Sequence, residues 1–175
     1  MLRLVTPDLF VESVAAIDPA MLRERGVEGL VMDLDCTLCD WRATSIPPST
    51  RVWIDGMRSA GLRLCILSNG GKARVTPLAD QLGIPCVTRA AKPLTYGLHA
   101  ALAKLGLPAD RVAVIGDQLF TDVMVGRLAG ATTILVRPTS DVEAWVTRIK
   151  RPLERVILRR LAISGGVTKR YGAVS

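Results

Sequence analysis

Four aspartates stand where short apolar segments end. Asp33 and Asp35 lie two apart at the end of residues 29–35, and Asp117 and Asp122 follow a later apolar segment. Side chains two apart in an extended segment point the same way, so the first two carboxylates repel each other unless a cation lies between them. Carboxylates are oxygen ligands that suit Mg²⁺. The spacing therefore indicates a metal site, provided that both segments end at one edge of the fold.

Groups that could bind a phosphate follow other apolar segments. Ser68 comes after the run 62–67 and offers a hydroxyl, and the small residues 69–71 can turn backbone amides toward an anion. Lys92 precedes an expected helix at 94–105 and supplies a point charge for phosphoryl oxygens. With the four carboxylates, these groups make up the electrostatic apparatus that phosphoryl transfer requires.

Alternating apolar runs and helical patterns must position these groups. Short apolar runs predict strands buried on both faces, and the intervals between them are long enough for helices of about three turns. The expected strands are 29–35, 62–67, 84–87, 111–115 and 131–136, and the expected helices are 48–60, 72–82, 94–105 and 118–129. This alternation favours right-handed βαβ units and a parallel sheet covered on both faces. In such a sheet ligands bind beyond the carboxyl ends of the strands, where the acids, Ser68 and Lys92 fall.

These residues match four motifs in the order in which one enzyme superfamily carries them. Asp33, Asp35 and Thr37 fit Asp-x-Asp-x-Thr, and the later motifs fall on Ser68, on Lys92, and on Asp117 with Asp122. Over about residues 29–137 the chain thus resembles the haloacid dehalogenase (HAD) superfamily of phosphatases. Within it, the chain is most similar to the YqeG-like group of subfamily IIIA. That likeness rests on Pro7-Asp8, Leu-Ser-Asn-Gly at 67–70, Gly-Asp-Gln at 116–118 and Arg151-Pro-Leu-Glu-Arg155, while Cys36 replaces the usual asparagine.

The resemblance implies a fold and a set of residue roles. It implies an α/β, HAD-like Rossmannoid fold in three layers, with a central parallel sheet of about five strands. Asp33 would attack phosphorus and form an aspartyl-phosphate, and Asp35 would act as general acid and then general base. The implied Mg²⁺ ligands are Asp33, the backbone carbonyl of Asp35, Asp117 and, directly or through water, Asp122. The implied phosphate-binding residues are Ser68, Lys92, Thr37 and, through backbone amides, Leu34 and Asn69.

The intervals between the motifs leave no room for a cap domain. Asp35 and Ser68 are 33 residues apart, and Ser68 and Lys92 are 24 apart. An open site suits a bulky phosphoester, or a small one if an oligomer partner covers the site. The YqeG-like group includes mitochondrial enzymes that dephosphorylate phosphatidylglycerophosphate, so the resemblance implies this lipid phosphate as substrate. The alternatives are a capless phosphatase of a soluble sugar or nucleotide phosphate, and a HAD-like RNA-binding module with incidental catalysis.

The net charge of +7 comes from the C-terminal segment alone. Residues 1–147, the expected phosphatase domain, hold 15 basic and 15 acidic side chains, whereas 148–175 hold eight basic ones against Glu154. Apolar residues recur there at helical spacing, which predicts a basic amphipathic helix over 148–163. Such a helix binds an anionic membrane surface or packs on its own domain. Nucleic acid is the less favoured partner, because a pure binding module has no need of Asp35.

Composition favours an ordinary folded protein in a reducing compartment. Hydrophobic residues make up 49% and charged residues 22%, and no apolar stretch is long enough to cross a bilayer. The N-terminus lacks the pattern of a signal peptide. We therefore expect a cytoplasmic protein, peripheral at the inner face of the membrane if the tail binds lipid. Cys36 and Cys39 form a CxxC pair without a second pair at zinc spacing, so free thiols are expected.

Overall fold

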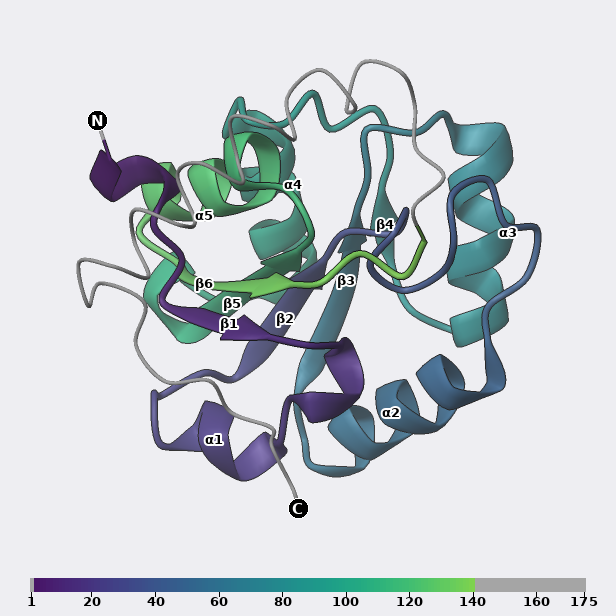
Figure 1. Cartoon of the computed structure of the whole chain (residues 1–175), viewed down its shortest axis with the longest axis horizontal. Coiled ribbons are helices and arrows are strands. Elements are labelled where there is room, and N and C mark those ends of the chain that lie inside the picture. Colours follow the sequence, from purple (N-terminus) through teal and green to yellow (C-terminus); the bar gives the residue numbers. More distant parts are fainter. Residues whose placement is uncertain (1, 141–175) are drawn as a thin grey trace.

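The computed structural model describes residues 2–140 of the chain, which form one parallel sheet with helices on both faces (Figure 1). The six strands lie in the order β1-β6-β5-β2-β3-β4. They are β1 (Leu9–Val11), β2 (Gly29–Met32), β3 (Arg63–Leu67), β4 (Cys86–Val87), β5 (Val112–Gly116) and β6 (Thr132–Val136). The α-helices are α1 (Pro19–Arg23), α2 (Pro48–Ser59), α3 (Lys72–Leu82), α4 (Tyr96–Leu105) and α5 (Met124–Ala129). The expected helix at 148–163 and the boundary at 147 lie outside the described residues.

The expected three-layer α/β fold is confirmed, with one strand more than predicted. All five expected strands form, and β1 adds a sixth beside β6, where Leu9 pairs with Ile134. Asp8 anchors this edge, because its carboxylate accepts hydrogen bonds from the backbone and hydroxyl of Thr133 and pairs with Arg127 at 2.7 Å. Strand β1 has only three residues, so it depends on these contacts more than on its own apolar pattern.

Alternate residues of the central strands supply the two cores between the layers. Leu30 and Met32 point toward the apolar side chains of α1, α2 and α3, while Val31 packs against those of α4 and α5. Figure 1 shows α2 and α3 on one side of the sheet and α4 and α5 on the other. This period of two is what a strand buried on both faces requires. A loop joins β2 to α2, and α3 alone lies between β3 and β4. Neither interval therefore contains an inserted domain.

The segment after β5 departs from the expected single helix at 118–129. A π-helical turn, Leu119–Val123, comes first and leads directly into α5. Both Asp122 and Val123 donate backbone hydrogen bonds to the carbonyl of Gln118. A widened turn of this kind is a frequent feature of functional sites, because it redirects side chains that a regular helix would place elsewhere.

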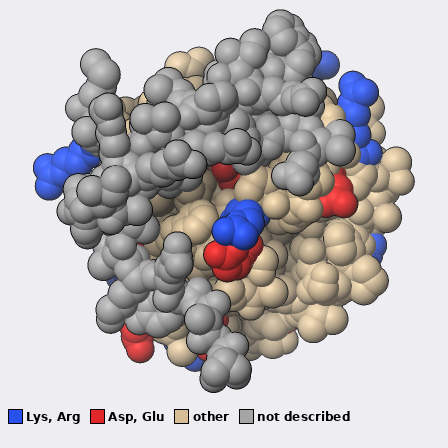
Figure 2. All heavy atoms as spheres, in the orientation of Figure 1, with Lys and Arg blue, Asp and Glu red and all other residues tan. Residues whose placement is uncertain are grey.

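Basic and acidic side chains are balanced in number over residues 1–147. On the face shown in Figure 2, most of the coloured Lys and Arg side chains lie near the edges of the view, and one lies at the centre directly against acidic atoms. Among residues 2–140, no helix combines the length and the apolar character needed to cross a membrane.

Candidate active site

Three of the predicted acids meet at the carboxyl ends of neighbouring strands. Asp33 follows β2, Asp117 follows β5, and Asp122 lies in the π-helical turn after β5. Strands β2 and β5 are paired in the sheet, so their ends coincide. One carboxylate oxygen from each acid lies within 4.8 Å of the other two, and all three side chains are buried. We call Asp33, Asp117 and Asp122 the acid cluster.

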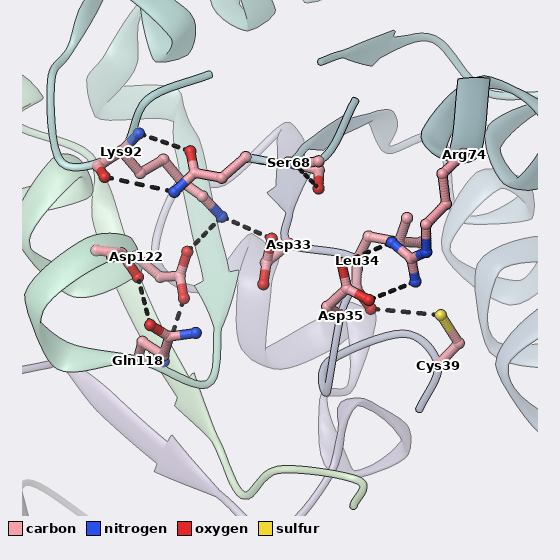
Figure 3. A network of polar contacts seen from close by, with 12 residues as sticks. Asp33, Leu34, Asp35, Cys39, Ser68, Arg74, Lys92, Gln118 and Asp122 are labelled. Atoms are coloured by element: carbon pink, nitrogen blue, oxygen red, sulfur yellow. Dashed lines mark hydrogen bonds and ion pairs between the residues drawn. The ribbon is translucent and has the colours of Figure 1, made fainter. Parts of the chain in front are cut away.

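Lys92 holds two members of the acid cluster together. Its Nζ donates to Asp33 Oδ1 and to Asp122 Oδ1, each at 2.6 Å (Figure 3). The second oxygen of Asp122 accepts the backbone N–H of Gln118 at 3.1 Å. Three ionised carboxylates and one ammonium leave a net charge of −2, which a single divalent cation would balance. The acid cluster is therefore chemically suited to Mg²⁺.

Burial and charge shift the pKa values of both partners of this pair. Burial raises the pKa of Asp33 from 3.8 to about 7; Lys92 opposes this shift and Asp122 adds to it. Burial alone would lower the pKa of Lys92, but the charges of Asp122 and Asp33 outweigh it and hold that pKa above its ordinary value. Lys92 thus remains a cation, whereas Asp33 carries its charge at a cost that a metal ion would relieve.

Gly116 lets Asp122 approach the end of β5. A Cβ atom on Gly116 would lie 2.2 Å from Cγ of Asp122, far inside van der Waals contact. No side chain larger than hydrogen fits there unless Asp122 moves out of the acid cluster.

Replacing Gly116 with alanine is therefore expected to weaken Mg²⁺ binding and to lower the free energy of unfolding by about 1–3 kcal/mol. Metal titration and chemical denaturation measure the two effects. Gly56→Ala is the matched control, because a Cβ there meets nothing within 4 Å in the middle of α2. It is expected to bind Mg²⁺ normally and to be slightly stabilised. Unchanged metal binding in Gly116→Ala would refute the role assigned to this glycine.

Ser68 and Asn69 lie at the end of β3, beside the acid cluster. Ser68 is buried, and its Oγ accepts the backbone N–H of Gly70 at 3.0 Å. The side chain of Asn69 clamps the backbone of Lys92: its Oδ1 accepts the Lys92 N–H at 2.8 Å, and its Nδ2 donates to the Lys92 carbonyl at 3.4 Å. Asn69 was predicted for its backbone amide alone, and this clamp shows a second role in positioning Lys92.

Leu34 and Thr37 shape the turn after β2. The backbone N–H of Leu34 bonds to the Asp33 carboxylate, which favours the charged form of that acid. The Leu34 carbonyl accepts the N–H groups of Leu38 and Cys39, closing the turn. Thr37 is buried, and its Oγ1 makes no hydrogen bond to any residue of the described range. Phosphate binding by either residue stays a prediction.

The Asp35 side chain lies apart from the acid cluster. Its carboxylate forms a two-pronged ion pair with Arg74 of α3, in which Arg74 Nη1 lies 2.8 Å from Oδ2 (Figure 3). The backbone N–H of Arg42 also donates to Oδ1 at 3.4 Å. Sequence reasoning missed Arg74, although its place in the first turn of the helix after Ser68 puts it at the same edge of the sheet. A metal contact through the Asp35 backbone carbonyl stays a prediction.

The four cysteines are free thiols, as expected. Cys39 donates to the Leu34 carbonyl at 3.6 Å, and burial, reinforced by nearby Asp35, raises the pKa of its thiol to about 12. Burial also raises the pKa of Cys65 to about 12. Thiols that stay protonated at neutral pH are poor nucleophiles and poor metal ligands, so the chemistry of the site belongs to its carboxylates.

Comparison with known proteins agrees with this geometry. The haloacid dehalogenase-like hydrolase family matches residues 15–130. The chain is 37% identical to the probable phosphatase YqeG of Bacillus subtilis, over 92% of this chain and 94% of the relative. It is 26% identical to the chloroplastic/mitochondrial phosphatidylglycerophosphate phosphatase 1 of Arabidopsis thaliana, over 89% of this chain but only 48% of that protein.

A solved structure shares the fold. The 3-deoxy-D-manno-octulosonate 8-phosphate phosphatase of Moraxella catarrhalis, solved with magnesium, phosphate and the sugar, aligns with a TM-score of 0.50 and 19% identity. The alignment covers 67% of this chain and 82% of that one. With the family match and the extended similarity to YqeG, the conclusion is that this chain is a phosphatase of the haloacid dehalogenase-like hydrolase family.

Proposed function

We propose that the chain is a Mg²⁺-dependent phosphomonoester hydrolase that acts through an aspartyl-phosphate on Asp33, with phosphatidylglycerophosphate as its substrate. The observation that carries the chemistry is the buried acid cluster bridged by Lys92, with Nζ 2.6 Å from both Asp33 and Asp122. The proposed nucleophile Asp33, the oxygen ligands of the acid cluster and the cation of Lys92 thus lie next to one another in one buried site.

The acid cluster fits the metal that this chemistry requires. Three buried carboxylates with an excess of negative charge form a hard oxygen donor set, and Asp33, Asp117 and Asp122 would hold the ion. When bound, Mg²⁺ offsets the negative charge that would otherwise repel the phosphate and stabilises the charge that develops on the transferring phosphoryl group.

The proposed reaction divides one displacement into two. A carboxylate oxygen of Asp33 attacks phosphorus as the bond to the leaving oxygen breaks, and Asp35 gives that oxygen its proton. Asp35 then takes a proton from water, whose oxygen attacks the phosphorus of the aspartyl-phosphate, releasing inorganic phosphate and restoring Asp33. Ser68 and Lys92 hold the phosphoryl oxygens through both steps, with backbone amides near Leu34 and Asn69.

Two features support a lipid phosphate as the substrate. Relatives from Arabidopsis thaliana and Chlamydomonas reinhardtii that match about nine-tenths of this chain are phosphatidylglycerophosphate phosphatases. In addition, no domain is inserted between β2 and β4 in the described residues, so nothing there limits the size of the leaving group. We further propose that the basic segment 148–175 binds the anionic lipid surface.

A panel of phosphoesters tests the substrate. The full chain is offered phosphatidylglycerophosphate in anionic vesicles, a set of soluble sugar and nucleotide phosphates, and 4-nitrophenyl phosphate, each with and without Mg²⁺. The proposal predicts that the lipid is hydrolysed with the highest kcat/KM. Deleting 148–175 should slow turnover on vesicles and spare 4-nitrophenyl phosphate. Preference for a soluble phosphate would refute the lipid assignment, and equal activity of the truncated chain on vesicles would refute the role of the tail.

Mg²⁺ should raise the melting temperature by a larger increment as pH rises from about 6 to about 8. Because the pKa of Asp33 is raised to about 7 in the folded protein, protons compete with the metal below that pH.

Without metal, stability should fall as pH rises from about 4 to about 7, since the folded state binds the proton more tightly than the unfolded state. Thermal melts across this pH series measure both trends. In Asp33→Asn, both the metal-free stability and the rise in melting temperature caused by Mg²⁺ should depend less on pH. If the rise caused by Mg²⁺ in the wild-type protein does not vary with pH, Asp33 is not the group that competes with protons for the metal.

A further inference from the structure

A hollow of about 360 Å³ opens beside Asp35, between the loop after β2 and the first turns of α3. Its polar lining comes from Arg42, Thr44 and Arg74, and its apolar lining includes Ala43, Pro77 and Leu78. Two guanidinium groups and a hydroxyl thus surround a small apolar floor. None of these residues belongs to the acid cluster or to the predicted phosphate-binding set.

Asp35 lies at the edge of the hollow. Its carboxylate is bonded to the Arg74 guanidinium (Figure 3) and to the backbone N–H of Arg42, and both of these arginines line the hollow. In the proposed reaction Asp35 gives its proton to the leaving oxygen. Whatever is attached to that oxygen must therefore lie next to Asp35, and the hollow offers space for it there.

The hollow carries an excess of positive charge. Arg74 is paired with Asp35, but the Arg42 side chain makes no ion pair with any residue in 2–140 and only lies over the Trp41 ring, 5.8 Å from its centroid. The Nε of Arg74 is buried and donates to no described residue. Two guanidiniums against one carboxylate leave one positive charge at the hollow, and it is carried by the exposed side chain of Arg42. An anionic group is the ligand that complements this charge.

We propose that this hollow is a leaving-group subsite that binds a second anionic phosphate, carried by the leaving alcohol a few bonds from the reacting phosphomonoester. The inference rests on the proposed hydrolase activity and names the feature of the substrate that the site selects. Phosphatidylglycerophosphate has this chemistry, because a phosphodiester stands across the glycerol from its terminal phosphate. A soluble bisphosphate has it as well. The apolar floor suits the carbons that join the two groups.

Paired substrates with and without a second phosphate test the subsite without a membrane; the members of the first pair differ by a glycerophosphoryl group, and those of the second by a phosphate alone. The first pair is glycerophosphoglycerol phosphate, which is the deacylated lipid, and glycerol 1-phosphate. The second pair is fructose 1,6-bisphosphate and fructose 6-phosphate. The full-length wild-type chain is expected to show a KM about tenfold lower for the doubly anionic member of at least one pair. An advantage confined to the glycerol pair points to the lipid headgroup, whereas one in both pairs shows recognition of any second phosphate.

Arg42→Gln should remove this advantage by raising the KM about tenfold for the doubly anionic substrate alone, with kcat nearly unchanged. Arg3→Gln is the matched control, because Arg3 is also exposed but does not line the hollow, and it should alter the kinetics of neither substrate. A loss of activity common to both members of a pair, or no loss at all, would overturn the subsite.

The proposed function fails in a distinguishable way. If 4-nitrophenyl phosphate is hydrolysed with Mg²⁺ and Asp33→Asn is inactive, the chemistry stands whatever Arg42→Gln does. If no phosphomonoester is hydrolysed at all, the proposed function is refuted, and so is the leaving-group subsite that rests on it.

Discussion

Replacing Asp33 with asparagine is expected to lower kcat at least about 10⁴-fold on every phosphomonoester, because the amide cannot attack phosphorus. The substitution changes little else in the site. Lys92 keeps its 2.6 Å contact with Asp122, and the asparagine has nearly the volume of the aspartate. Steady-state release of inorganic phosphate measures the loss.

The stability of the Asp33→Asn variant provides its control. Burial makes the charge on Asp33 costly, as its pKa of about 7 indicates, so a neutral amide should not destabilise the metal-free protein at pH about 8. The variant should unfold at or above the wild-type temperature without Mg²⁺ and gain less from added Mg²⁺. Residual activity within about tenfold of wild type would exclude Asp33 as the nucleophile.

Replacing Lys92 with methionine is expected to impair both folding stability and catalysis. Methionine fills similar space but leaves the carboxylates of Asp33 and Asp122 buried without their cation. Breaking a buried ion pair from one side costs about 3–5 kcal/mol, and the loss of a cation at the transferring phosphoryl group costs about 10²–10³ in kcat/KM. Chemical denaturation without metal and phosphate-release kinetics measure the two effects.

Lys104→Met separates the role of the site from a general effect of removing a lysine. Lys104 lies exposed in the last turn of α4, so its loss should change stability by less than about 0.5 kcal/mol. Mg²⁺ should restore part of the stability of Lys92→Met, since the ion takes over the compensation of charge in the acid cluster. A metal-free Lys92→Met protein as stable as wild type would mean that the carboxylates do not depend on this lysine.

The strand ends could be predicted from the sequence because buried strands of a parallel sheet have a simple pattern. Short apolar runs that end in Asp33, Ser68 and Asp117 fix which side chains reach the carboxyl edge. Once the strands are paired in order, these groups have to meet. The meeting of Asp33, Asp117 and Asp122 follows from the pairing of β2 with β5 and from the turn after β5.

The missed features depend on contacts that are distant in sequence. Arg74 reaches Asp35 across 39 residues, and Asn69 holds the backbone of Lys92 across 23. Strand β1 is stabilised by pairing with β6, more than 120 residues away in the chain, as the hydrogen bonds between Asp8 and Thr133 show. Such contacts are set by tertiary packing, and local propensity carries no sign of them. The π-helical turn at Leu119–Val123 likewise differs from a regular helix only in its hydrogen bonds.

The most direct test of the account is to trap the phosphoryl group on Asp33. In Asp35→Asn, the second step lacks its general base, while 4-nitrophenyl phosphate has a leaving group that needs no acid. Rapid mixing should therefore give a burst of nitrophenol equal to the enzyme concentration, followed by slow turnover. Mass spectrometry should find one phosphoryl group on the peptide that contains Asp33, and none when Asp33 is also replaced by asparagine. A phosphoryl group on another residue, or steady turnover with neither burst nor adduct, would contradict the aspartyl-phosphate mechanism.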